Sequence, residues 1–79
     1  MTKDELLSVI KQNLYEIIPE LEDEDFSIDE KLVDLGLNSI DRGELITMTL
    51  ESFESDLPRV DFVKAQTLEE IAEVFLEKA

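Results

Sequence analysis

The chain is organised around the stretch Asp34-Leu35-Gly36-Leu37-Asn38-Ser39-Ile40-Asp41-Arg42, in which a glycine-containing turn leads directly into a helix. Gly36 can adopt the positive φ angles that end a preceding turn. Asn38 is a favoured N-cap residue, whose side chain accepts a hydrogen bond from an amide of the first helical turn. With Asn38 as the cap, the Ser39 hydroxyl is left free at the positive end of the helix dipole, which suits an attached phosphodiester. Ser39 is therefore the candidate functional residue, although a serine at a helix start is commonly only a cap.

The composition describes one small acidic domain. A chain of 79 residues buries only part of its unfolded surface, which predicts a small core and modest stability. The 21 acidic residues outnumber the 7 basic residues and give a formal net charge of -14. This charge repels nucleic acids and anionic membranes, favours partners with basic surfaces and opposes self-association, so we expect a monomer that binds neither nucleic acid nor membrane.

Two residue types are missing from the chain. Without cysteine it has no disulfide, thiol nucleophile or thiolate metal site, and without histidine an enzyme would depend on carboxylates, lysines and one tyrosine. No long apolar run follows the first residues, so we expect neither a secretory signal nor a membrane span, and a cytoplasmic location. The initial Met1 favours a free-standing protein over a segment of a larger one.

Apolar spacing predicts a first helix that ends near residue 18. Thr2 and Glu5 have the spacing of a capping box, and Pro19 ends the helix because it cannot continue the hydrogen-bond ladder. The apolar residues between them fall on one helical stripe, widened by Leu6 and Ile18: Leu7, Ile10, Leu14, Ile17 and Leu21.

Residues 20–34 form a long acidic connection without a sustained period. We expect its apolar residues to hold it against the helices, with a short helical turn at residues 29–33: Phe26, Ile28, Leu32, Val33 and Leu35. Oxygen-bearing residues at alternate positions resemble the start of an EF-hand calcium loop: Asp23, Asp25, Ser27 and Asp29. Ile28 stands where that loop needs glycine and Asp34 where it needs glutamate, so we expect no dedicated metal site.

A second helix is expected from about Ser39 to Phe53. Its buried stripe should be Ile46, Leu50, Phe53 and Leu57. A second stripe is acidic with one exposed methionine: Asp41, Glu44, Met48, Glu51 and Ser55. This stripe is either an ordinary solvated face or a docking surface, in which carboxylates attract basic partners and Met48 adapts to apolar contacts. Gly43 lies inside this helix. It either packs closely against another helix, is simply tolerated, or clears space beside Ser39 for an attached group or a partner.

The remaining residues predict a short helical turn and a last helix. Pro58 should end the second helix, and residues 59–65 should form a turn with Val60 and Val63 pointing inward. Thr67 and Glu70 form a second capping box, before a helix whose core face, with Leu76 beside it, is Leu68, Ile71, Ala72 and Phe75.

These elements together predict an all-α fold in a single domain over residues 1–79. It is a small antiparallel four-helix bundle of three longer helices and one short helix, with a long loop between helices one and two.

The stretch around Ser39 resembles the modification motif of acyl carrier proteins, whose usual form is Gly-x-Asp-Ser-Leu, with Asn38 in place of the common Asp and Ile40 in place of the common Leu. The resemblance runs through nearly the whole chain. A narrower likeness is to discrete carriers of polyketide β-branching cassettes, which supply an acyl group to an HMG-type synthase. It rests on Asn38-Ser39-Ile40-Asp41-Arg42, Thr47-Met48-Thr49-Leu50-Glu51, Leu57-Pro58-Arg59-Val60 and Lys64-Ala65.

The resemblance implies that a pantetheinyl transferase uses coenzyme A to attach 4'-phosphopantetheine to Ser39, that the arm carries acyl groups as thioesters, and that the chain itself catalyses nothing. An acyltransferase, ketosynthase or HMG-type synthase with a basic docking surface would recognise the second helix at Asp41, Arg42, Glu44, Met48 and Glu51.

Several alternatives remain open at the level of sequence. Within the family, the chain would be a fatty-acid carrier or an aminoacyl or peptidyl carrier. Outside it, the chain would be an acidic calcium- or partner-binding module in which Ser39 is only a cap, or, as the last choice, an enzyme that uses two carboxylates.

Overall fold

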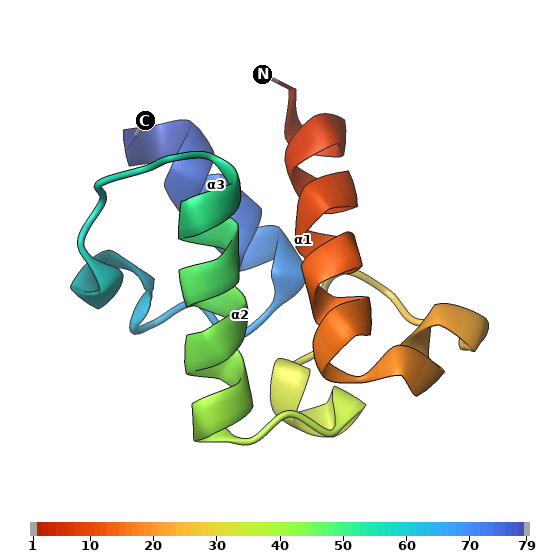
Figure 1. The fold of residues 1–79 in the computed structure, drawn as a ribbon. Helices are drawn as coiled ribbons and strands as arrows, with labels where there is room; N and C mark the ends of the chain where they lie inside the picture. The colour runs from red at the N-terminus through yellow and green to blue at the C-terminus, as the bar shows by residue number, and fades with distance from the viewer. Residues whose placement is uncertain (1, 79) are drawn as a thin grey trace.

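The computed structural model describes residues 2–78, and these residues are almost entirely helical (Figure 1). The three α-helices are α1 (Lys3–Ile17), α2 (Ser39–Ser52) and α3 (Leu68–Lys78), and the three 3-10 turns are η1 (Pro19–Asp23), η2 (Leu32–Leu35) and η3 (Arg59–Phe62). The described part of the chain contains no β-strand, only a single antiparallel bridge between Lys31 and Thr67. Within residues 2–78, no helix is both long enough and apolar enough to span a bilayer.

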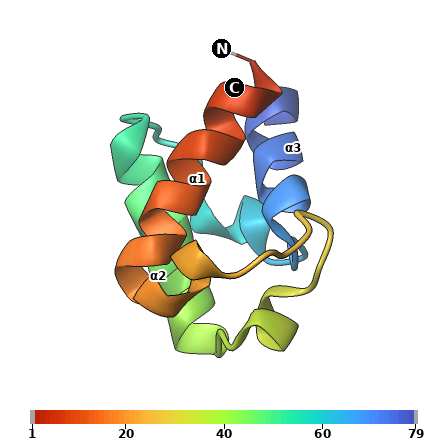
Figure 2. The same cartoon turned by 90° about the vertical axis from the view of Figure 1, so that its right-hand side faces the viewer.

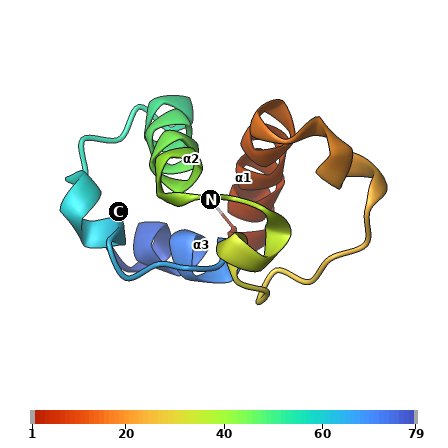
Figure 3. The same ribbon diagram turned by 90° about the horizontal axis from the view of Figure 1, so that it is seen from below.

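The α-helices form a bundle around one apolar centre. Figure 1 shows α1 and α2 side by side and running in opposite directions, with α3 behind them, and Figure 3 shows from below that α3 crosses the pair. The start of α1 and the end of α3 lie at one end of the bundle, and the start of α2 lies at the other. Ser39, the first residue of α2, therefore lies at the opposite end of the bundle from the start of α1 and the end of α3.

The first helix has the expected bounds. Thr2 caps it through the capping box predicted with Glu5, and it ends at Ile17, just before Pro19. Its buried residues are Leu6, Leu7, Ile10 and Leu14, while Leu21 reaches the core from η1.

Aromatic and polar contacts tie the helices together. Phe75 of α3 packs against Phe62 of η3 and Phe53, with ring centroids 5.1 and 5.4 Å apart. Thr49 is a fully buried polar residue of α2, and its hydroxyl donates to the Leu45 carbonyl at 2.8 Å and lies 3.2 Å from the donor Asn13 Nδ2 of α1. Because these groups are hydrogen-bonded, the buried hydroxyl does not carry the cost of an unpaired polar group.

The long connection between α1 and α2 is held at defined points. The Leu32 amide donates to the Gln66 carbonyl at 2.8 Å, and the Glu69 amide donates to the Ile28 carbonyl at 3.1 Å. Figure 2 shows this connection passing beside the start of α3. The short helical turn expected at residues 29–33 forms instead at Leu32–Leu35, so Leu32 is buried but Val33 points to solvent, and the prediction that Val33 anchors the loop was wrong.

The expected short fourth helix is a single 3-10 turn, η3. The described residues therefore contain three α-helices, and the fourth member of the expected bundle is not an α-helix. The prediction that Val60 and Val63 point inward was also wrong, because their side chains are 69% and 59% exposed while Phe62 is fully buried. In so short a turn one residue suffices to reach the core, and the large ring of Phe62 takes that place.

Other positions also differ from the expected core. Leu76 is 45% exposed on α3, whereas Leu37 and Leu45 are buried although the expected stripes did not include them. Leu45 is buried because α2 contacts neighbours on more than one side, which widens its buried face beyond a single stripe.

Candidate functional site

A glycine in the left-handed backbone conformation precedes α2. Gly36 ends η2 with φ of 103°, and its amide donates to the Val33 carbonyl at 3.2 Å. A side chain at this position would be strained by that backbone angle, not by its surroundings, since the nearest atom to an added Cβ, on Ile18, lies 3.9 Å away. The predicted role of Gly36 is therefore confirmed, and it turns the chain toward Asn38.

Asn38 caps α2, as predicted. Its Oδ1 accepts from the Asp41 amide at 2.8 Å, while the Asp41 carboxylate accepts from the Asn38 amide at 3.3 Å. The two residues form a reciprocal capping box, which leaves Ser39 as the first helical residue with its hydroxyl outside the capping network. Ser39 is exposed, so this hydroxyl is accessible to a partner enzyme.

Two surface hollows meet at Ser39. One, of about 460 Å³, lies toward the long connection and is also lined by Lys31, Leu32, Val33, Leu37 and Gln66. The other, of about 280 Å³, lies between α2 and η3 and is also lined by Gly43, Ile46, Arg59, Val60, Phe62 and Val63. Apolar side chains and cationic residues thus line the two hollows on either side of the serine.

Exposed apolar side chains are concentrated around this serine. Four of the five large hydrophobic residues most exposed within residues 2–78 either follow Ser39 directly or line one of its two hollows: Val33, Ile40, Val60 and Val63. Apolar side chains gathered at one place on a surface indicate a contact site for a ligand or another protein.

The Arg42 side chain makes hydrogen bonds within the chain. Its Nη1 donates to the carbonyls of Val63 and Ala65, both at 3.1 Å, and so joins α2 to the segment between η3 and α3. The residue is half-buried and lines both hollows beside Ser39. Arg42 therefore shapes the site from within, and the contact with a partner that the resemblance implied stays a prediction.

The acidic stripe on α2 is only partly open to solvent. Glu44 and Glu51 are exposed, Asp41 is half-buried in the capping box, and Met48, expected to be exposed, is half-buried. Glu44 and Glu51 are thus the carboxylates on this stripe that a partner can reach most easily.

The structure fills the space expected beside Gly43. A Cβ on Gly43 would lie 2.8 Å from Nη2 of Arg59, and this nitrogen donates to the Gly43 carbonyl at 3.4 Å. The group that occupies this space is thus the Arg59 guanidinium and not another helix, and a role of the glycine in the Ser39 site stays a prediction. The sequence reasoning missed Arg59 and Lys31 as site residues, although the scarcity of basic residues in so acidic a chain was a signal that could have drawn attention to them.

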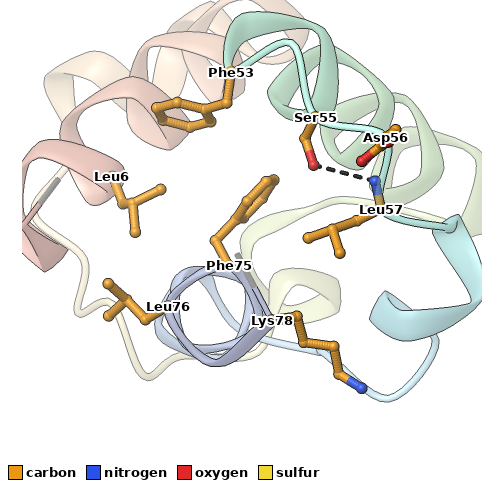
Figure 4. A pocket seen from close by; sticks show the side chains of 8 residues that line it. All are labelled: Leu6, Phe53, Ser55, Asp56, Leu57, Phe75, Leu76 and Lys78. Atoms are coloured by element: carbon orange, nitrogen blue, oxygen red, sulfur yellow. Dashed lines mark hydrogen bonds between the residues drawn. The ribbon is translucent and has the colours of Figure 1, made fainter.

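Another hollow lies at the other end of α2 (Figure 4). It measures about 550 Å³ and is lined by Leu6, Phe53, Ser55, Asp56, Leu57, Phe75, Leu76 and Lys78. A helix of 14 residues is about 20 Å long, so this hollow is separated from Ser39 by the length of α2. It belongs to a different face of the molecule from the site at Ser39.

The site at Ser39 thus combines an exposed serine, a neighbouring helix cap and two flanking hollows. The family model for the phosphopantetheine attachment site matches residues 4–75. The chain belongs to this family, whose members carry 4'-phosphopantetheine covalently and are not themselves enzymes. The predicted resemblance is confirmed, and an exposed hydroxyl flanked by arginines fits the phosphodiester of such a group.

Two relatives agree with the narrower likeness. The polyketide biosynthesis acyl-carrier protein AcpK of Bacillus subtilis (strain 168) is 37% identical over 78 residues, which are 99% of this chain and 95% of that protein. The second is found in the crystal structure of the curacin biosynthetic pathway HMG synthase in complex with its acetyl donor-ACP. One chain of that structure is 36% identical, with a TM-score of 0.91, over 99% of this chain and all of that one.

Proposed function

We propose that this chain is an acyl carrier protein of polyketide biosynthesis and that Ser39 bears its phosphopantetheine. The assignment of Ser39 rests on one observation. Asn38 caps the helix and leaves the hydroxyl of the neighbouring Ser39 free. The terminal thiol of the bound group supplies the thioester chemistry, which the chain, lacking cysteine, does not provide itself. The carrier domain spans residues 1–79, acts as a monomer, and works in the cytoplasm.

The residues around Ser39 have separate roles in this proposal. Gly36 and Asn38 fix the position of the hydroxyl for the pantetheinyl transferase that uses coenzyme A. The exposed valines and Ile40 make an apolar rim against which partner enzymes, whether transferase, acyltransferase or ketosynthase, can exclude water. The carboxylates on α2 attract basic surfaces of those enzymes and orient the approach.

The proposed partner is an HMG-type synthase, to which this carrier donates an acetyl group. The proposal is supported by the likeness to a chain of the curacin HMG synthase–donor-ACP structure, at 36% identity over 99% of this chain and all of that one. It is also supported by the surface chemistry of α2, where Glu44 and Glu51 are exposed and can pair with basic residues of a synthase.

An acetyl-transfer experiment tests this function. The modified, acetyl-loaded carrier is mixed with the curacin-pathway HMG synthase, and acetylation of the synthase is followed by intact mass spectrometry, with that synthase's own donor carrier as the reference. We expect the synthase to gain an acetyl group from this carrier and none from the Ser39→Ala variant. A synthase that accepts acetyl from its own donor but not from this carrier would contradict the donor role.

A fatty-acid or peptidyl carrier is the second candidate, because those carriers share the bundle and the serine. The same loaded carrier offered to a fatty-acid ketosynthase separates the two candidates. Efficient transfer there, without transfer to the synthase, would favour the second.

A further inference from the structure

Both arginines of this acidic chain lie beside Ser39. Arg42 and Arg59 line the same hollow as the serine, and Lys31 lines the other hollow that meets it. Three of the seven basic residues therefore line the two hollows that meet at Ser39, in a chain with 21 acidic residues. Cationic groups gathered at one point of such a surface favour an anion there.

Arg59 is free to bind such an anion. The ion pairs within residues 2–78 join Lys3 to Glu69 and Lys78 to Asp61, so no carboxylate in this part of the chain lies within 4.0 Å of either arginine. The bond from Arg59 Nη2 to the Gly43 carbonyl is 3.4 Å long, well beyond the usual length of about 2.9 Å for such bonds. A guanidinium held by one long bond to a neutral carbonyl can exchange it for a shorter, charge-assisted bond to a phosphate oxygen.

Gly43 places this guanidinium next to the serine. Residues four apart in a helix share a face, so Gly43 lies one turn beyond Ser39 on the same side of α2. A side chain at Gly43 would come within 2.8 Å of Arg59 Nη2 and displace it. Arg42, three residues beyond Ser39, is already committed to the carbonyls of Val63 and Ala65, so Arg59 is the arginine able to move.

We propose that Arg59 binds the phosphodiester attached to Ser39, that Gly43 is present to let it do so, and that this contact directs the arm along the hollow between α2 and η3. The inference rests on the proposed attachment at Ser39. Arg59 is a positioning residue here, since it holds the base of the arm and touches no reacting atom. Its effect is to favour one of the two hollows, where Ile46, Val60 and Phe62 offer apolar surface to the arm.

The presence of only two arginines makes a direct test possible. In nitrogen-15-labelled protein the side-chain Nε–H region contains two arginine signals, which the variants Arg42→Gln and Arg59→Gln assign. Spectra are recorded before and after complete modification, as judged by intact mass, together with the phosphorus-31 spectrum of the phosphodiester. We expect the Arg59 signal to shift on modification, and the Arg42 signal to shift less.

Variants separate a phosphate contact from a general charge effect. Arg59→Gln should change the phosphorus-31 shift and narrow its line, because the released phosphodiester moves faster. Lys64→Gln removes the same charge from an exposed residue that lines neither hollow, and should leave the phosphorus signal unchanged. Gly43→Ala should reproduce the effect of Arg59→Gln while keeping both arginines.

The possible failures are distinguishable. An Arg59 signal that stays in place in fully modified protein, or equal phosphorus-31 spectra for Arg59→Gln and Lys64→Gln, would overturn this inference and leave Arg59 to the carboxylates of a partner protein. Absence of any mass gain on the parent chain would instead contradict the proposed function, and this inference with it.

Discussion

Oδ1 of Asn38 lies 2.8 Å from the backbone nitrogen of Asp41, and this contact makes Asn38 the residue that caps α2. Had Ser39 been the cap, its hydroxyl would have been occupied by a helix amide. The presence of Asn38 in place of the common Asp keeps the geometry of the cap while removing one negative charge beside the serine. The Ser39 hydroxyl is therefore free because the neighbouring Asn38 caps the helix.

Replacing Asn38 by Ala should destabilise the protein by about 1 kcal/mol, because the Asp41 amide loses its acceptor. Asn38→Asp should retain most of the stability, since a carboxylate accepts the same bond. Ser39→Ala is the matched control one residue along, and its free energy of unfolding should stay within about 0.5 kcal/mol of the parent. Urea unfolding measures all three. Equal losses for Asn38→Ala and Ser39→Ala would mean that the two residues share the cap.

Arg42→Gln should lower the free energy of unfolding by about 1–2 kcal/mol, because the carbonyls of Val63 and Ala65 lose a charged donor. Arg59→Gln is the control, since its side chain is exposed and makes one long bond, and it should cost less than about 0.5 kcal/mol. Urea unfolding of the unmodified chains tests this. If Arg42→Gln is as stable as the parent yet loses partner binding, the role of Arg42 is in docking after all.

Reversing the exposed charges of α2 should slow acyl transfer to a basic partner. Glu44→Lys and Glu51→Lys together should reduce kcat/KM about tenfold or more at low ionic strength, and the loss should shrink as salt screens the charges. Glu73→Lys, on an exposed position of α3, is the matched control and should have a much smaller effect. A loss that is equal at Glu73, or that does not depend on salt, would argue against steering by α2.

The carboxyl group of Glu5 should titrate below its ordinary pKa of 4.5. The backbone amide of Thr2 donates to this carboxylate at 3.0 Å and the Thr2 hydroxyl lies 3.1 Å from it, and both contacts favour the charged form and lower the pKa. Because the pKa of Glu5 is lowered in the folded state, the capping box stabilises α1 fully at pH values above the ordinary pKa of this carboxyl group. This stabilisation is lost as the pH falls through the pKa of the folded protein.

Thr2→Ala should move the Glu5 pKa only part of the way back, because the backbone donor remains. Carbon-13 NMR titration of the glutamate carboxyls measures the change. A pKa of Glu5 at or above 4.5 in the parent chain would show that this capping box does not persist in solution.

Helix starts were predictable from the sequence because each carries its own chemical signal. Thr2 and Glu5 form the expected reciprocal cap, and Asn38 caps α2 as expected, while the return bond from the Asn38 amide to the Asp41 carboxylate was not predicted. The second box expected at Thr67 is only half formed, since Thr67 accepts from the Glu70 amide while the Glu70 carboxylate binds the amide of Gln66 instead. Local side-chain chemistry thus fixes where a helix begins, with small variations in the partner.

The residue that ends α2 could not be predicted in the same way. α2 ends at Ser52, close to the expected end near Phe53, but the residue that stops it is Glu54, with φ of 49°, and not Pro58. The Ser55 amide donates to the Leu50 carbonyl at 2.9 Å. This is the hydrogen-bond pattern of a Schellman motif, which glycine usually completes. Because residue 54 is a glutamate and not a glycine, the left-handed turn could not be predicted from the sequence.

The environment of the candidate site was also beyond the sequence, because it is assembled from distant segments. Ser39 was identified from its own neighbours, but Lys31 and Arg59 reach it only through the folding of η2 and η3 against α2. The same holds for Val60 and Val63, whose exposure follows from Phe62 filling the core. Short 3-10 turns carry too few residues to reveal which side faces inward.

The central claim is that Ser39 is the attachment point of phosphopantetheine, and intact mass spectrometry tests it most directly. The parent chain, Ser39→Ala and Ser8→Ala are each incubated with coenzyme A and a pantetheinyl transferase of broad specificity, where Ser8 is an exposed serine of α1. We predict one added phosphopantetheine on the parent and on Ser8→Ala, and none on Ser39→Ala. Addition to Ser39→Ala, or no addition to a folded parent while a known carrier is modified in the same tube, would contradict the assignment.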